Sequence, residues 1–159
     1  MKILVMSDSH GVWESMCRAV EQEQPRQILF LGDGLHDADR LHVRYPDLPI
    51  ITVPGNCDHD FFDEPERLIE IDGVRILMMH GHTRRVKYDS LAAYYAAREM
   101  GAQILLYGHT HRPLVDYDGH LFTMNPGTIG GRRTNSTYGV ILIENGKIDC
   151  HTVQLEPIR

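Results

Sequence analysis

The sequence predicts one α/β domain, residues 1–159, built on mixed β-sheets. Its first half alternates apolar strands with amphipathic helical stretches, whereas its second half contains pairs of strands joined by short turns. The first pattern is typical of parallel strands and the second of antiparallel strands, so a purely parallel doubly wound sheet is disfavoured. A composition that is 42% hydrophobic and 24% charged, over 159 residues, is that of a globular domain with one core.

The first half contains three predicted strands, at residues 2–6, 27–31 and 49–53. A helix follows the first strand, because apolar side chains recur at the i, i+3, i+4, i+7 spacing until Pro25. A second, short helix is expected over residues 37–44. The apolar residues of the first helix are Trp13, Met16, Cys17 and Val20.

The second half contains three predicted hairpins, each of which turns on an Asp-Gly or Asn-Gly pair that tolerates positive φ. A helix over residues 91–100 is expected to begin after Asp89 or Ser90 as its N-cap and to end at Gly101. A strand over residues 103–107 follows this helix. The hairpin strands are 67–71 with 74–79, 114–117 with 120–124, and 137–143 with 147–153.

Charge and patterning disfavour several classes of protein. The formal charge of −6 argues against strong nucleic-acid binding, which needs Lys and Arg to neutralise phosphates. The longest apolar run, residues 91–97, is too short to cross a membrane, and residues 3–6 are too short for a secretory signal. The cysteines, Cys17, Cys57 and Cys150, form no Cys-x-x-Cys pair, which disfavours both disulfides and thiolate zinc. We therefore expect a cytoplasmic protein without a membrane partner.

Five polar segments directly follow predicted strands, and together they carry seven oxygen or imidazole donors. Ligand sites in open α/β sheets lie at the carboxyl ends of strands, so these segments are expected to meet in one crevice. Such donors suit Mn, Fe, Co, Ni or Zn, and seven of them suit two ions that share a carboxylate. The donors are Asp8, His10, Asp33, Asn56, His80, His109 and His111.

The spacing within these segments has a geometric explanation. In Asp8-x-His10 and His109-x-His111, one intervening residue is expected to direct both side chains to the same side of an extended loop. The neighbouring glycines are expected to allow sharp turns and close approach of the backbone. These glycines are Gly32, Gly55 and Gly108.

In their order, the segments resemble the blocks of the calcineurin-like metallophosphoesterases, in particular the small single-domain phosphodiesterases of bacteria and archaea. The blocks are Asp-x-His, Gly-Asp, Gly-Asn, a lone His and Gly-His-x-His. The trailing hairpins and residues 125–128 also resemble this branch, so the resemblance covers essentially the whole chain. It implies a four-layer α/β/β/α sandwich of two mixed β-sheets flanked by helices. It also implies two divalent ions per chain, with manganese expected and Ni, Fe, Co or Zn as alternatives. One ion would be held by Asp8, His10 and His111 and the other by Asn56, His80 and His109, with Asp33 bridging them.

The same resemblance implies hydrolysis of phosphodiester bonds in a small-molecule phosphate ester, with Asp33, Asn56 and His109 as catalytic residues. The mechanistic hypothesis is in-line attack by a metal-bridging hydroxide without a phosphoenzyme. Cys57 stands where the broader family often has a histidine that protonates the leaving group, and a thiol is a poor replacement. His59 and His82 are the candidate general acids, and we expect a preference for acidic leaving groups such as aryl phosphates.

Other functions fit the same residues. A phosphomonoesterase or nucleotidase would use the same centre, and a non-catalytic scaffold, like the retromer scaffold subunit of eukaryotes, would share the fold with an impaired metal site. A mononuclear metal-binding protein is a further alternative. Retention of all seven donors disfavours the scaffold.

Two of these assignments have alternatives. His82 is the alternative to His80 as a metal ligand, and a homo-oligomer contact is the alternative to core packing for the apolar helix faces. No substrate role is assigned to the nearby cations, which are Arg84, Arg85, Lys87, Arg112, Arg132 and Arg133.

Overall fold

The computed structural model describes residues 1–59, 63–132 and 135–157. The described residues form two mixed five-stranded sheets, three α-helices and one 3-10 helix. Arg133 lies outside the described residues. The predicted α/β class with mixed sheets is confirmed.

The first sheet has the strand order β10-β9-β1-β2-β3. Its parallel part consists of β1 (Lys2–Met6), β2 (Gln27–Phe30) and β3 (Ile50–Thr52). β9 (Thr137–Glu144) runs antiparallel to β1, and β10 (Lys147–Gln154) runs antiparallel to β9. The carboxyl ends of β1, β2 and β3 therefore lie at one edge of this sheet.

The second sheet has the strand order β4-β5-β6-β8-β7. Its three central strands, β5 (Val74–Met79), β6 (Ile104–Leu106) and β8 (Phe122–Asn125), are parallel. Its two edge strands, β4 (Glu66–Ile71) and β7 (Leu114–Tyr117), are antiparallel to their neighbours. This sheet also has three carboxyl strand ends side by side.

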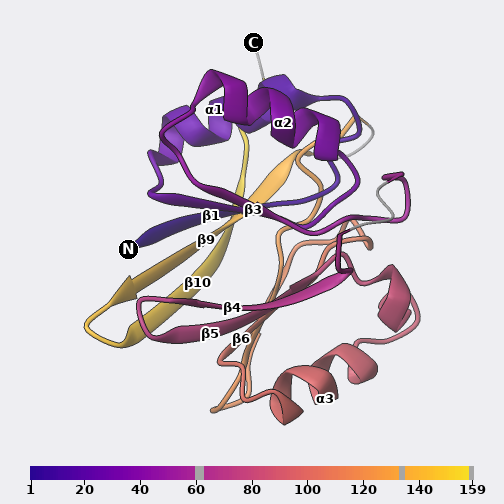
Figure 1. Ribbon diagram of the computed structural model, residues 1–159, viewed down its shortest axis with the longest axis vertical. Helices are drawn as coiled ribbons and strands as arrows, with labels where there is room; N and C mark the ends of the chain where they lie inside the picture. Colours follow the sequence, from indigo (N-terminus) through magenta and orange to yellow (C-terminus); the bar gives the residue numbers. More distant parts are fainter. Residues whose placement is uncertain (60–62, 133–134, 158–159) are drawn as a thin grey trace.

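The two sheets pack face to face between helices (Figure 1). α1 (Trp13–Glu23) and α2 (Leu35–Arg44) cover the outer face of the first sheet, and α3 (Leu91–Glu99) covers the outer face of the second. The short 3-10 helix η1 (His82–Arg84) follows β5. The structure thus confirms the four-layer α/β/β/α sandwich.

The side chains of β1 point alternately to the two faces of the first sheet, and this explains how the layers pack. Ile3 and Val5 face the second sheet, whereas Leu4 and Met6 face α1 and α2, and all four side chains are fully buried. A strand buried on both faces reads as a continuous apolar run, which is why β1 shows no period of two in the sequence. The apolar helix faces, such as that of Met16, are core, as expected.

Two of the three predicted tight turns are confirmed. Asp72 and Gly73 both have positive φ (48° and 77°), and so do Asn145 and Gly146 (51° and 76°). Both residues of a type I′ turn adopt this conformation.

The predicted Asp-Gly turn between β7 and β8 is wrong. β8 begins at Phe122 rather than at residue 120, which leaves a four-residue loop. Asp118 stabilises this longer loop, because its Oδ1 accepts the backbone N–H groups of His120 and Leu121, each at 2.8 Å.

The start of α2 differs from the prediction, whereas α3 begins at Leu91 as predicted. α2 begins at Leu35, two residues before the predicted start, because a carboxylate described below accepts the first N–H groups of this helix. At α3, Asp89 Oδ1 accepts the backbone N–H of Leu91 at 3.0 Å, whereas Ser90 makes no capping bond with its side chain. Of the two candidate caps, Asp89 is therefore the one that satisfies a helix donor.

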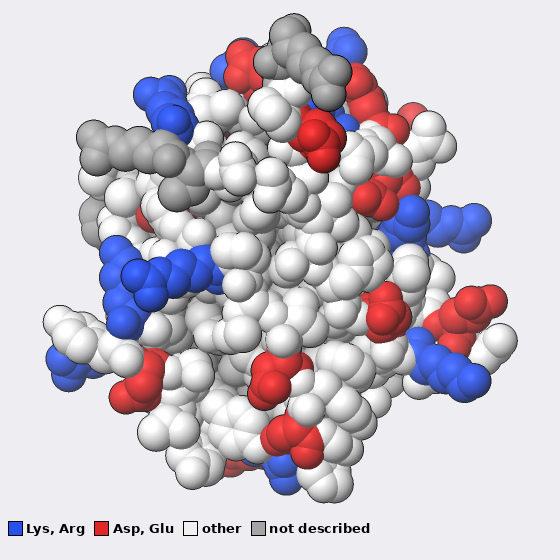
Figure 2. Space-filling view, turned by 180° about the vertical axis from the view of Figure 1, so that it is seen from behind, with Lys and Arg blue, Asp and Glu red and all other residues white. Residues whose placement is uncertain are grey.

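The molecular face turned away from the viewer of Figure 1 carries charges of both signs. Figure 2 shows Lys and Arg in small groups among Asp and Glu, around a broad uncharged area. Within the described part of the chain, no helix combines the length and apolar character needed to cross a membrane.

Candidate metal centre

The seven predicted donors meet where the carboxyl ends of the parallel strands of both sheets come together. Three loops of the first sheet supply four donors: Asp8 and His10 follow β1, Asp33 follows β2, and Asn56 follows β3. Two loops of the second sheet supply the imidazoles of His80, His109 and His111. The strand-end rule thus predicted correctly that these side chains come together.

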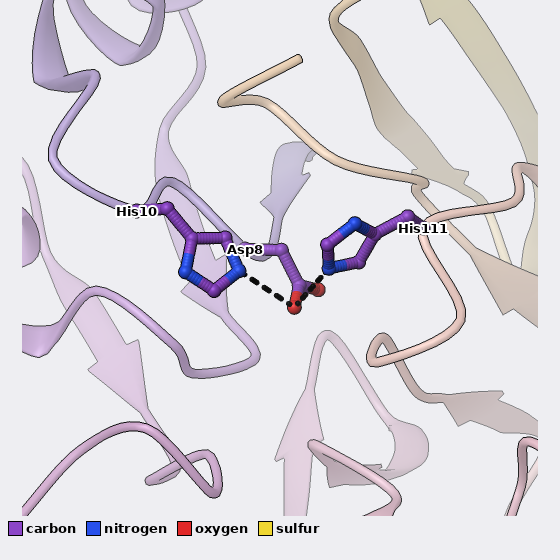
Figure 3. A group of neighbouring side chains, drawn as sticks. All are labelled: Asp8, His10 and His111. Atoms are coloured by element: carbon purple, nitrogen blue, oxygen red, sulfur yellow. Dashed lines mark hydrogen bonds and ion pairs between the residues drawn. The ribbon is translucent and has the colours of Figure 1, made fainter. Parts of the chain in front are cut away.

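Asp8 lies at the centre of the first group of donors, between His10 and His111 (Figure 3). Its Oδ1 lies 3.1 Å from His111 Nε2 and 3.6 Å from His10 Nε2, and its Oδ2 accepts the backbone N–H of His109 at 3.1 Å. The carboxylate is fully buried, whereas the His10 and His111 side chains are 37% and 45% exposed. This group therefore has a buried anionic base and an open mouth.

The electrostatics of Asp8 favour the charged form. Burial raises the pKa of Asp8, but its hydrogen bonds with His10 and His111 outweigh burial and hold this pKa well below its usual range. Asp8 is therefore an ionised carboxylate throughout the neutral pH range.

His80 lies at the centre of the second group, which also contains Asp33 and His109. His80 Nε2 lies 3.0 Å from Asn56 Oδ1, 3.1 Å from His109 Nδ1 and 3.4 Å from Asp33 Oδ2. The other ring nitrogen, Nδ1, lies 2.8 Å from the carbonyl oxygen of Leu31, in a fully buried position. Because a carbonyl oxygen only accepts hydrogen bonds, His80 Nδ1 carries a proton and donates it to Leu31.

The donor set around His80 Nε2 fits a cation. With Nδ1 protonated, a neutral His80 presents a lone pair at Nε2, and this lone pair faces the acceptor oxygens of Asn56 and Asp33. Burial lowers the pKa of His80, but the hydrogen bond to Asp33 and the charges of Asp8 and Asp33 outweigh burial and raise it above its usual value. The site therefore stabilises positive charge at this point, as a metal site must.

Asp33 lies between the two groups. Its Oδ2 is 3.4 Å from His80 Nε2 and 3.8 Å from His10 Nε2. Its Oδ1 accepts the backbone N–H of Cys57 at 2.8 Å, which leaves Oδ2 directed toward the histidines. One carboxylate is thus in reach of donors from both groups.

Cys57 lies at the exposed rim of the centre rather than packed inside it, and its Sγ lies within 4.8 Å of donor atoms of His10 and Asp33. Partial desolvation and the charge of Asp33 raise the pKa of the Cys57 thiol. The thiol is therefore protonated at neutral pH, and only a thiolate is a good nucleophile or metal ligand.

The two candidate general acids lie in different surroundings. The ring of His82 lies 5.4 Å from that of His80 and 6.2 Å from that of His109, and burial together with the charge of His80 lowers the pKa of His82. His82 belongs to neither group of donors. His59 is exposed.

Two aspartates that the sequence analysis assigned no role hold the donor loops in place. Both oxygens of Asp58 accept backbone N–H groups: Oδ2 from Asp33 at 2.7 Å and Gly55 at 2.8 Å, and Oδ1 from Gly34 and Leu35 at 3.0 Å each. Asp58 thereby joins the loop after β2 to the loop after β3. The signal available in the sequence was an aspartate three residues after a strand-end glycine, which favours a local hydrogen-bonded turn.

Asp37 does the same for the loop after β1. Its Oδ2 accepts the hydroxyl of Ser9 at 2.6 Å and the backbone N–H of Gly11 at 2.8 Å. Asp37 is buried in the first turn of α2, so this helix fixes the loop that carries His10.

The prediction that Asp8-x-His10 and His109-x-His111 lie in extended loops is wrong. Five donors have left-handed backbone conformations, which cost roughly 1–2 kcal/mol each for residues other than glycine. The loops therefore turn sharply at the donors themselves, and tertiary hydrogen bonds hold them there, as from Asp8 N to the carbonyl oxygen of Gly32 at 2.9 Å. The φ values are 57° at Asp8, 44° at His10, 58° at Asp33, 68° at His109 and 60° at His111.

The glycines next to the donors allow close approach, as predicted. A Cβ on Gly55 would lie 2.1 Å from Asp33 Oδ1, and a Cβ on Gly108 would lie 2.1 Å from Ser7 Oγ. The Cβ on Gly55 would also lie 2.5 Å from the backbone nitrogen of Asp33, so a larger residue there would displace the loop that carries Asp33.

Comparison with known proteins agrees with this geometry. A family model described as the calcineurin-like phosphoesterase superfamily domain matches residues 1–147. The probable metallophosphoesterase YsnB of Bacillus subtilis is 35% identical over 160 residues, which cover 97% of this chain and 89% of YsnB. The phosphodiesterase YfcE of Escherichia coli K12 is 27% identical over 153 residues, which cover 81% of this chain and 79% of YfcE.

Solved structures share the fold over nearly the whole chain. A predicted phosphoesterase from Streptococcus pneumoniae superposes with a TM-score of 0.80 at 26% identity and covers 96% of this chain and 88% of its own. A single mutant of Vps29 from Entamoeba histolytica superposes with a TM-score of 0.76 at 21% identity and covers 98% of this chain and 100% of its own. The second likeness shows the fold alone.

Proposed function

This chain belongs to the calcineurin-like phosphoesterase superfamily, and on that premise we propose that it hydrolyses small phosphodiesters with two divalent metal ions. The observation that carries the proposal is the set of acceptors around His80 Nε2, where the oxygens of Asn56 and Asp33 lie 3.0 and 3.4 Å from a ring nitrogen. The relative YfcE, named a phosphodiesterase, supports the type of ester.

In this proposal Asp8, His10 and His111 hold one ion, and Asn56, His80 and His109 hold the other. Asp33 is shared between the ions. When bound, two divalent ions neutralise charge on a phosphate ester and lower the pKa of water; manganese is the metal that we expect.

The side chains of the centre have distinct roles in this proposal. Burial and the charge of His80 lower the pKa of His109 to about 4, so His109 is a neutral donor at pH 7. We infer that Asp33, Asn56 and His109 position the reacting phosphate. Because the Cys57 thiol is protonated, water rather than a side chain is the nucleophile in this proposal.

The leaving group determines which esters react fastest. Cys57 is a poor proton donor for a basic alkoxide, since its raised pKa makes the thiol a weaker acid. We therefore expect aryl phosphodiesters, whose leaving groups depart without protonation, to be the best substrates.

The test is metal content measured together with hydrolysis. The protein is loaded with Mn²⁺, its bound metal is quantified by mass spectrometry, and hydrolysis of bis(4-nitrophenyl) phosphate is followed with and without chelator. About two ions per chain and chelator-sensitive hydrolysis are expected. About one ion per chain would indicate a mononuclear protein, and faster hydrolysis of 4-nitrophenyl phosphate would indicate a phosphomonoesterase. A full metal load without hydrolysis of either ester would favour a scaffold.

A further inference from the structure

An open cavity of about 540 Å³ lies beside the loop after β6 that carries two of the predicted donors. Thr110 lines this cavity, and Thr110 also separates His109 from His111, so one loop forms a wall of the cavity and supplies two of the donors. Its volume lies within the range of about 300–1,000 Å³ that is usual for small-molecule sites.

The lining combines an apolar floor with a basic rim. Val86 and Tyr107, which are 5% and 4% exposed, belong to the buried core beneath α3. Lys87 and Arg112 line the same cavity and are exposed, and no carboxylate is among the lining residues. An aromatic or sugar ring could therefore lie on the floor while an anion meets the rim.

Lys87 and Arg112 differ from the other cations of the same region. Arg84 forms two hydrogen bonds with Glu66, at 2.6 and 3.0 Å, and Arg85 lies over the ring of Tyr88, 4.9 Å from its centroid. Among the ion pairs of the described residues, none involves Lys87 or Arg112. These two positive charges are thus available to a ligand.

We propose that this cavity binds the organic arm of the diester and that Lys87 and Arg112 bind a second anionic group on that arm. The substrate class is therefore a phosphodiester with a ring-containing arm that carries an additional phosphate, as in a nucleoside bisphosphate ester. This inference rests on the proposed function, because it places the reacting phosphate at the metal centre.

The test uses two esters that differ in one phosphate. Thymidine 5′-(4-nitrophenyl phosphate) and its 3′-phosphorylated counterpart release the same leaving group, so a difference between them reports binding of the arm. In the Mn²⁺-loaded protein, the 3′-phosphate is expected to lower KM by about tenfold at low ionic strength and to leave kcat within about twofold.

Three variants locate the effect. Lys87→Met and Arg112→Met are each expected to reduce the preference for the 3′-phosphate by about threefold, with unchanged metal content and unchanged KM for the ester without it. Arg85→Met is the matched control, because it removes an exposed cation from the same segment outside the cavity. Equal KM values for the two esters in the unaltered protein would overturn the inference. So would equal effects of Lys87→Met on both esters, or a loss of preference in Arg85→Met.

A binding measurement separates this inference from the proposed function. Calorimetry with thymidine 3′,5′-bisphosphate and thymidine 5′-monophosphate needs no turnover, and the bisphosphate is expected to bind about tenfold more tightly through Lys87 and Arg112. If neither ester is hydrolysed but this difference is found and is lost in the two variants, the proposed function fails and the subsite stands. Equal affinities for the two nucleotides would overturn the subsite whatever the activity.

Discussion

Replacing Asp58 with asparagine removes the acceptor that joins two donor loops. Asp58 Oδ2 accepts the backbone N–H groups of Asp33 and Gly55, and an amide NH₂ in this place would face two donors without an acceptor. A buried donor left unsatisfied costs about 1–3 kcal/mol. Because Asp58 is only half-buried, we expect a cost in the lower part of that range for each of the two N–H groups. The free energy of unfolding should therefore fall by about 2–3 kcal/mol.

For a chain of 159 residues, this loss corresponds to a Tm roughly 4–12 °C lower. The assay is urea and thermal unfolding followed by circular dichroism in the presence of chelator, so that metal binding does not contribute. Asp89→Asn is the matched control: Asp89 accepts one exposed N–H, from Leu91, and asparagine is an equally good cap, so its stability should stay within about 0.5 kcal/mol. An Asp58→Asn protein as stable as the control would refute the reasoning.

Three further predictions concern the metal centre. The Asp33→Asn protein should lose bound Mn²⁺, and its kcat/KM should fall by roughly 100-fold or more, because Asp33 is the carboxylate in reach of both groups of donors. Normal turnover in a variant shown to have lost its metal would contradict the two-metal proposal. Cys57→Ser should keep kcat within about threefold, since the thiol is protonated at neutral pH, and a large loss measured with bis(4-nitrophenyl) phosphate would assign the thiol a catalytic role. Metal affinity should rise as the pH increases above 6.5, because the pKa values of His10 and His80 are raised above that value and each imidazole must lose its proton to bind a metal. Calorimetry in buffers of different ionisation enthalpy should detect the released protons, and an affinity that does not change with pH would exclude this linkage.

Much of the fold could be predicted because it depends on local patterns. The Asp72-Gly73 turn and the carboxyl ends of the parallel strands follow from residue type and from alternation of strands with helices. The loop after β7 was mispredicted, because Asp118 captures two N–H groups beyond the expected turn. A side chain that competes for backbone donors is not visible in an Asp-Gly dipeptide alone.

The candidate site shows the same division. The strand-end rule predicted that all seven donors lie close together. It could not predict that Asp8 and His111 adopt left-handed backbone conformations. Such conformations are imposed by tertiary hydrogen bonds, and no propensity of aspartate or histidine predicts them at a given position. The roles of Asp37 and Asp58 stayed hidden for the same reason, since their partners are backbone N–H groups of other loops.

The contact between Asp8 and His111 has a consequence for how the two halves of the molecule stay together. It joins residues 103 positions apart, one from each sheet. A permanent link of that span would remove chain entropy from the unfolded state worth roughly 4–5 kcal/mol, as a disulfide across a loop of about 100 residues does. Any ligand that binds both side chains therefore acts as a removable cross-link. Its release would weaken the contact between the two sheets as well as leave the donors without a ligand.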